Sequence, residues 1–176
     1  MLFKKSILIP LALCLAPLAQ AVSDEANLML EHTETLTKKF DAVENAFANW
    51  GGGFITIVSP AMALQGLHSA YVLAAEDAKM SHQFTKEESD LIMQGMQSKG
   101  DAGEKANGAI IKKSEAVLST KIGFVAQGLV EVLKRDIENY LDAMSPKLGP
   151  GHDSNIRKLR SRVDTALKQT INSLLR

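Results

Sequence analysis

The segment SDEANLMLEHTETLTKKFDAVENAFANWGGG, residues 23–53, decides the fold class of this chain. Its large apolar residues recur mostly at steps of three and four, with charged residues between them, a spacing typical of an amphipathic α-helix. The apolar positions are Met29, Leu36, Phe40, Val43, Phe47 and Trp50. Gly51, Gly52 and Gly53 end the pattern, because consecutive glycines carry the largest backbone entropy cost in a helix.

The next residues, FITIVSPAMAL (54–64), have the composition of a strand or of a membrane-seeking segment. A short strand would need a partner, and no other part of the chain offers one. The run is also too short to span a membrane. We therefore expect an apolar joint or first turn that covers one end of a helical bundle, hinged by the three glycines. Ser59-Pro60 is expected to supply the N-cap and first turn of the second helix.

Further helices follow from the same periodicity. The second helix is expected to end near Met80, and Thr85 and Glu88 form a capping box that opens a short third helix, closing near Gly100. The last helix begins at Ser154.

Residues 102–144 contain no proline and keep helical spacing throughout. A straight helix of that length would run about 60 Å, whereas a compact chain of this size has a radius of gyration of about 15 Å. It should therefore bend, split or project, with Ser119-Thr120, Gly123 and Gly128 as the weak points. Together these segments predict an all-α, single-domain bundle of five or six helices, one of them long.

The first 21 residues have the parts of a secretory signal peptide: two lysines, an apolar stretch and the sequence AQA at 19–21. Residues 22–176 contain no cysteine, so we expect one domain held by its core without disulfides. Loss of Lys4 and Lys5 leaves 18 basic and 20 acidic side chains, a charge of −2 that offers no basic field for nucleic acid. No later run suggests a transmembrane segment or lipid anchor, so the expected fate is secretion.

The sequence contains no motif typical of a metal site or a catalytic site. The four histidines lie in different segments without metal-ligand spacing, so no metal site is predicted. Residues 77–88 imitate a calcium loop, but Lys79 and His82 occupy positions that need a ligand and a glycine. No nucleophile motif or phosphate loop is present, so we predict no catalytic residue, no cofactor and no enzyme.

The order of several segments resembles the fungal hydrophobic surface binding protein A family, which includes antigenic cell-wall galactomannoproteins. The segments are FDAVENAFANWGGGF, LHSAYVLAAEDA, TKEESDLI, AIIKKSEAVL, GLVEVLKRDIENYLDAMSP and RVDTALKQTINSLL. The resemblance implies a secreted helical domain that adsorbs to hydrophobic surfaces, and in some members encloses fatty acids between helices. The Ser/Thr-rich stalk and anchor of cell-wall members are missing here, which leaves wall association open.

Candidate ligand-binding residues follow from the helical faces. They are Leu64, Leu67, His68, Tyr71, Met93, Met96, Val117, Lys121 and Phe124. Within this set, His68, Tyr71 and Lys121 are the groups able to receive a buried lipid carboxylate. Each also has a structural interpretation, as a core-edge residue or as a lysine reaching to water. Met93 and Met96 are likewise either ordinary core or pocket wall.

The leading hypothesis is a secreted protein that binds a fatty acid or other lipid, or a hydrophobic surface. The glycine joint would open to admit the lipid tail or to present apolar surface to an interface. A second hypothesis is a helical interaction module, an effector or antigen that binds a partner protein. Pairing of two chains along the long helix would give a homodimer, and an enzyme ranks third.

Overall fold

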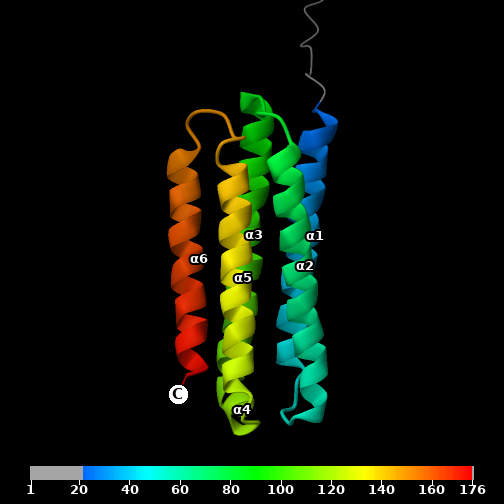
Figure 1. Ribbon diagram of the computed structural model, residues 1–176, viewed down its shortest axis with the longest axis vertical. Coiled ribbons are helices and arrows are strands. Elements are labelled where there is room, and N and C mark those ends of the chain that lie inside the picture. Colours follow the sequence, from blue (N-terminus) through cyan, green and yellow to red (C-terminus); the bar gives the residue numbers. More distant parts are fainter. Residues whose placement is uncertain (1–21, 176) are drawn as a thin grey trace, which may run out of the picture.

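Five long helices run alongside one another down the length of the molecule (Figure 1). The computed structural model describes residues 22–175, and the predicted signal peptide lies outside them. Within these residues all regular structure is helical. The elements are α1 (Asp24–Ala48), the 3₁₀ turn η1 (Ile55–Ile57), α2 (Val58–Met80), α3 (Lys86–Lys112), α4 (Ser114–Ser119), α5 (Gly123–Met144) and α6 (Asp153–Ser173).

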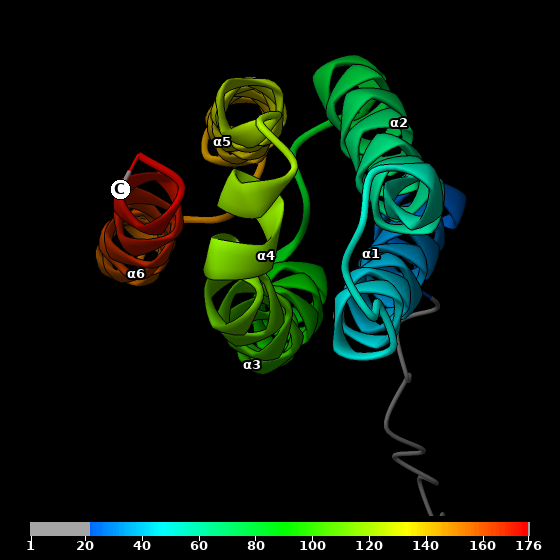
Figure 2. The ribbon, with the colours of Figure 1, turned by 90° about the horizontal axis from the view of Figure 1, so that it is seen from below.

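Seen end on, α1 and α2 form one side of the bundle, α3 and α5 lie in the middle, and α6 lies alone on the other side (Figure 2). α1 packs against α2 and α3, α2 packs against α5, and α6 lies across the far side of α3 and α5. The short α4 sits at one end, between α3 and α5 (Figures 1 and 2). The predicted all-α bundle is therefore confirmed, and all six apolar positions of the opening segment are buried in its core.

The capping box predicted at Thr85 is present and stabilises two helices. The Glu88 carboxylate accepts hydrogen bonds from the Thr85 backbone amide at 2.9 Å and from the Ser23 backbone amide at 2.8 Å. Ser23 in turn caps α1 by accepting from the Ala26 amide at 3.2 Å. These hydrogen bonds, with those from Ser23 first, lower the pKa of Glu88 to about 2. One carboxylate thus joins the starts of α1 and α3.

Replacing Glu88 by Gln should lower the free energy of unfolding by about 1–2 kcal/mol at pH 7, because the charge-assisted bonds are weakened. The folded pKa lies below the ordinary value, so this contribution is present above about pH 4.5 and disappears as the pH falls through about 2. Urea unfolding at pH 7 and pH 3 would measure it, with the exposed neighbour substitution Glu87→Gln as control. Equal losses in both variants would contradict the two-helix role.

The segment after the glycines is helical, as expected for a first turn. η1 continues directly into α2, so the predicted cap at Ser59 is wrong: Ser59 lies inside the first turn, and the residue preceding the helix is Ile57, without a side-chain cap. Gly52 and Gly53 adopt φ of 91° and 95°, the left-handed region that favours glycine. The Trp50 indole donates to the Thr56 hydroxyl at 3.0 Å and holds the turn together.

The expected end of the third helix at Gly100 is also wrong, because α3 continues to Lys112. Three of its four glycines, Gly95, Gly100 and Gly103, lie where side chains of α1 or α6 approach. A Cβ at Gly103 would lie 3.5 Å from the Phe40 ring, and one at Gly100 would lie 2.7 Å from the Arg162 guanidinium. Burial of Ala102 and Ala106 against the core outweighs the roughly 1 kcal/mol that each glycine costs a helix.

The predicted long helix over residues 102–144 is divided among α3, α4 and α5. One break falls where it was expected, after Ser119, and is made by Lys121 with φ of 61°. The other break, at Lys113, carried no sequence signal. The long helix along which a homodimer was predicted to pair is therefore not continuous, and the homodimer itself stays a prediction.

The combined η1–α2 segment is apolar on more than one face. Ile55–Met80 is long and apolar enough to cross a membrane, a property that many core helices of soluble proteins share. Of its most apolar 18 residues, 28% are buried. Leu64, Leu67 and Tyr71 pack into the core, whereas Ile55 and Met62 face outward. The sequence analysis predicted an apolar joint that leads into a helix, and in the structure this joint and the start of α2 expose large apolar side chains.

Candidate functional site

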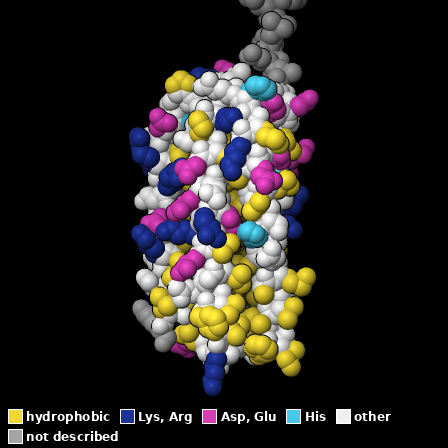
Figure 3. Space-filling view, in the orientation of Figure 1, with side chains coloured by type: hydrophobic (Ala, Val, Ile, Leu, Met, Phe, Trp, Pro, Cys, Tyr) yellow, Lys and Arg dark blue, Asp and Glu magenta, His cyan; other side chains and the backbone are white. Residues whose placement is uncertain are grey.

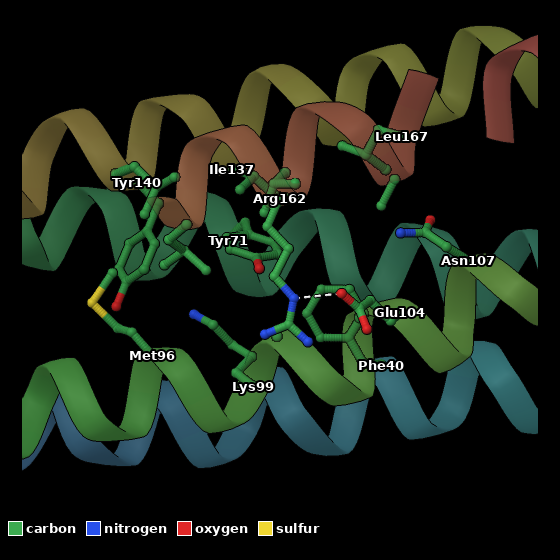
Figure 4. Close-up of a pocket in the computed structure, with 16 residues that line it drawn as sticks. Phe40, Tyr71, Met96, Lys99, Glu104, Asn107, Ile137, Tyr140, Arg162 and Leu167 are labelled. Carbon is green, nitrogen blue, oxygen red and sulfur yellow. Dashed lines mark hydrogen bonds and ion pairs between the residues drawn. The ribbon is translucent and has the colours of Figure 1, made fainter. Parts of the chain in front are cut away.

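A narrow cavity lies between the middle turns of α3, α5 and α6, with one residue each from α1 and α2 contributing to its wall (Figure 4). Its volume is about 40 Å³, room for two or three water molecules at roughly 15 Å³ each. Mostly apolar side chains surround it: Phe40, Met96, Ile137, Leu141, Leu159, Val163, Ala166 and Leu167, together with Tyr71, Lys99, Gly103 and Tyr140. This apolar pocket is the strongest candidate ligand site among the described residues.

A lysine projects into this apolar surrounding. Lys99 is 5% exposed, and its amino group lies 4.6 Å from the centre of the Tyr140 ring and 5.4 Å from that of Tyr71. Among the described residues, every salt bridge joins other groups, so no carboxylate neutralises Lys99. Burial alone lowers the pKa of Lys99 to about 7.

The two tyrosines complete a polar end of the pocket, with the Lys99 amino group between their hydroxyls in Figure 4. Tyr140 is fully buried, and its hydroxyl has no hydrogen-bond partner among the described residues. Against the larger effect of burial, Thr33 is near enough to lower the pKa of Tyr140, but the Thr33 hydroxyl donates to the Met29 carbonyl at 3.0 Å. Burial raises the pKa of both tyrosines, so both hydroxyls keep their protons and remain donors.

The mouth of the pocket is closed by an ion-pair cluster between α3 and α6. The Arg162 guanidinium contacts Asp101 at 2.7 Å and also pairs with Glu104 (Figure 4). These hydrogen bonds, with that to Glu104 first, raise the pKa of Arg162, and the Arg162 hydrogen bond lowers the pKa of Glu104. Arg162 is about 39% exposed in its side chain, so the cluster lies at the boundary with solvent.

The structure separates the residues predicted from sequence into three groups. Tyr71 and Met96 line the pocket. Leu64, Leu67, Met93 and Val117 are buried core residues outside its lining. Lys121 and Phe124 lie near the far end of the bundle, where Lys121 is exposed in the turn before α5 and Phe124 is 75% exposed. The hinge residues Gly51, Gly52 and Gly53 are also outside the pocket lining.

His68 is occupied elsewhere, since its Nδ1 lies 2.6 Å from Asp136 and joins α2 to α5. The other histidines also pair with carboxylates: His32 with Asp77, His82 with Glu25 and His152 with Asp90. Among residues 22–175 no cluster of three His, Cys, Asp or Glu side chains could hold a metal ion.

The sequence interpretation missed Lys99, Tyr140 and the whole of α6. A signal for Lys99 was present: it follows Ile92 and Met96 at helical spacing on the buried face of α3, where a lysine is out of place. The contribution of α6 had no such signal, because the pairing of its apolar stripe with α3 and α5 is a long-range property.

A second feature is an apolar tip at the α4 end of the bundle. Two contacts show that α2 and α5 run parallel: His68 with Asp136 at their middles, and Lys147 with the Lys79 carbonyl near their C-terminal ends. The start of α5 therefore lies level with η1. Both starts expose large side chains, and Figure 3 shows hydrophobic side chains gathered at this lower end. The apolar tip comprises Phe54, Ile55, Val58, Met62, Phe124 and Val125, which are 45–86% exposed.

Comparison with solved structures supports the fold. AFMP4P, in a crystal structure in complex with palmitic acid, matches with a TM-score of 0.82 and 17% identity over 85% of this chain and 99% of that chain. Ligand binding domain 1 of the Penicillium marneffei MP1 protein, complexed with arachidonic acids, matches with a TM-score of 0.80 and 13% identity over 85% and 98%. Ligand binding domain 2 of the same protein, complexed with multiple arachidonic acids, matches with a TM-score of 0.79 and 12% identity over 86% and 96%.

No curated protein matches the chain closely enough to inform its function. The family model described as hydrophobic surface binding protein A matches residues 26–146, from α1 to the end of α5. Since that match covers well over half of the chain, this protein belongs to the hydrophobic surface binding protein A family.

Proposed function

We propose that this protein is a secreted, non-enzymatic lipid carrier that encloses the acyl chain of a fatty acid or similar single-chain lipid in the pocket between α3, α5 and α6. The observation that carries the proposal is the pocket itself, a largely apolar cavity between the helices of the bundle. Proteins of the same fold are described as complexes with palmitic and arachidonic acids. Residues 22–176 act as one domain, and residues 1–21 direct it out of the cell.

The pocket must enlarge to hold an acyl chain, because its present volume is about 40 Å³. α6 is the wall best suited to move. It supplies Leu159, Val163 and Leu167 to the pocket, it packs mainly on α3 and α5, and the loop before it contains Gly151 with φ of 111°. Displacing α6 breaks the Arg162 cluster at the mouth, an exposed set of ion pairs that contributes little to stability.

Filling the pocket tests this proposal. Gly103→Leu places a side chain toward Phe40 inside the cavity and should reduce lipid uptake at least tenfold, since the acyl chain and the new side chain occupy the same space. Native mass spectrometry of protein purified without detergent, delipidated and then given palmitate, would count the bound lipids. Wild type should regain one or two lipid masses.

The matched control is Gly108→Leu, on the same helix, where a Cβ meets no atom within 4 Å. Both substitutions remove a helix glycine, so both gain helix propensity. Equal lipid uptake by the two variants, or a wild type that takes up no lipid, would sink the proposal.

A second candidate function, adsorption to a hydrophobic surface, is favoured by the apolar tip. Six large side chains exposed at one end of the bundle form a patch of the kind that marks interaction sites. The glycine joint is the movable part of this tip, and breaking the Trp50–Thr56 hydrogen bond would free η1 to spread on the surface. Secretion and association with the cell exterior are part of the same proposal.

A further inference from the structure

We infer that Lys99 is the headgroup-binding residue of the pocket, and that the ligand is a single-chain lipid with an ionised acidic headgroup, bound with its head inward. This inference rests on the proposed lipid-binding function and adds the charge, the orientation and the anchoring residue. The lipid tail would then extend from Lys99 past Arg162, along the apolar side chains of α6 toward Leu167.

The first support is the position of Lys99. A lysine on a surface helix normally carries its ammonium to water, but Lys99 is 5% exposed and faces the cavity. The nearest acidic groups on its own helix, Asp101 and Glu104, pair with Arg162 at the mouth. An ammonium without a counter-ion is strongly disfavoured in an apolar interior, so the site is built to gain an anion.

The second support is the donor set around it. Two aromatic rings lie within 5.4 Å of the ammonium and stabilise its charged form without neutralising it. Tyr140 lines the same cavity, and its buried hydroxyl makes no hydrogen bond among the described residues. A carboxylate has two oxygens and only accepts hydrogen bonds, so one oxygen can receive the Lys99 ammonium and the other the Tyr140 hydroxyl. A neutral alcohol or ester headgroup would leave the charge uncompensated.

The third support concerns pH. The titratable or charged groups that line the cavity with Lys99 are Tyr71 on α2, Tyr140 on α5, Arg162 on α6 and Glu104 on α3, and α1 contributes only Phe40. In the free protein the pKa of Lys99 is lowered to about 7 by burial, and a bound anion would raise it. Affinity for a permanently charged lipid should therefore be greatest below pH 7 and fall as the pH rises, by up to about tenfold per unit.

The test compares dodecanesulfonate, which stays ionised throughout, with dodecan-1-ol, which has the same chain and no charge. Binding of each to delipidated protein would be measured by calorimetry at pH 6 and pH 8.5. Wild type should bind the sulfonate at least tenfold more tightly than the alcohol at pH 6, and this preference should shrink about tenfold by pH 8.5. Lys99→Met should abolish the preference and its pH dependence, while alcohol binding is retained.

Two further variants sharpen the result. Tyr140→Phe removes only a hydroxyl and should weaken sulfonate binding several-fold, with alcohol binding unchanged. Lys105→Met changes an exposed lysine on the same helix and should alter neither. Equal affinity for both lipids in wild type, or a preference for the sulfonate that survives in Lys99→Met, would overturn the inference about Lys99. The proposed lipid-binding function would still hold in that case. Binding of neither lipid to wild type overturns both.

Discussion

Lys99→Met should raise the free energy of unfolding by roughly 2–4 kcal/mol at pH 6, because it replaces an unpaired buried ammonium by an apolar side chain of similar length. The cation–π contacts with Tyr71 and Tyr140 contribute about 2 kcal/mol at most to the wild type and do not offset the desolvation of the charge. A residue that binds an anionic ligand is expected to destabilise the ligand-free protein, because its charge is compensated only when the ligand is bound.

The effect has a definite pH dependence. An unfolded lysine titrates near 10.4, whereas the pKa of folded Lys99 is about 7. Between these values the unfolded chain binds more protons, so wild-type stability rises with pH, while the variant lacks this term. The advantage of Lys99→Met should therefore be full below pH 7 and shrink by about 1.4 kcal/mol per unit above it.

Urea unfolding at pH 6, 7, 8 and 9 measures this difference, and staying below pH 10 avoids titration of unfolded tyrosine. The control is Lys105→Met, which changes an exposed lysine and should stay within about 0.5 kcal/mol of wild type at every pH. A destabilised Lys99→Met protein, or a stability gain that is the same at pH 6 and pH 9, would show that the ammonium carries no burial penalty.

The second large effect is expected at the apolar tip. The double substitution Phe54→Ser, Ile55→Ser should weaken adsorption to an alkyl-coated surface by on the order of a hundredfold. Each of these side chains, 66% and 86% exposed in the free protein, contributes roughly 1.5 kcal/mol when it leaves water. Because both are exposed already, the free energy of unfolding should change by less than about 0.5 kcal/mol each.

A quartz-crystal microbalance coated with octadecylsilane would give the adsorption isotherms. The matched control is Met80→Ser, Leu91→Ser, which removes two exposed apolar side chains, 75% and 43% exposed, near the opposite end of the bundle. If the control loses as much adsorption as the tip variant, the surface is not recognised through the tip. Unchanged adsorption in the tip variant would assign surface binding to another face.

The tip and the pocket are separate sites, and their variants separate the two functions. Phe54 and Ile55 do not line the pocket, and Gly103 and Lys99 are absent from the tip. Tip variants should therefore keep their bound lipid, and pocket variants should still adsorb. This separation distinguishes a lipid carrier that also adsorbs from a protein whose lipid uptake depends on adsorption.

The sequence by itself determined the helical class, the buried stripe of α1, the glycine stop and the Thr85–Glu88 capping box. These depend on residues within one or two turns of each other, and helical periodicity, capping and left-handed glycine are local properties. The order of its segments was also sufficient to indicate the family that the comparison supports.

Only the tertiary structure decided how far α3 extends, which charged residues meet, and where the pocket lies. Gly100 does not stop α3, since packing of the helix outweighs its low propensity. His68 is paired with Asp136, 68 positions away, and Lys99 faces an enclosed cavity walled in part by α6. Each of these outcomes depends on which helix faces are brought together, and that choice is made by the packing of the whole chain.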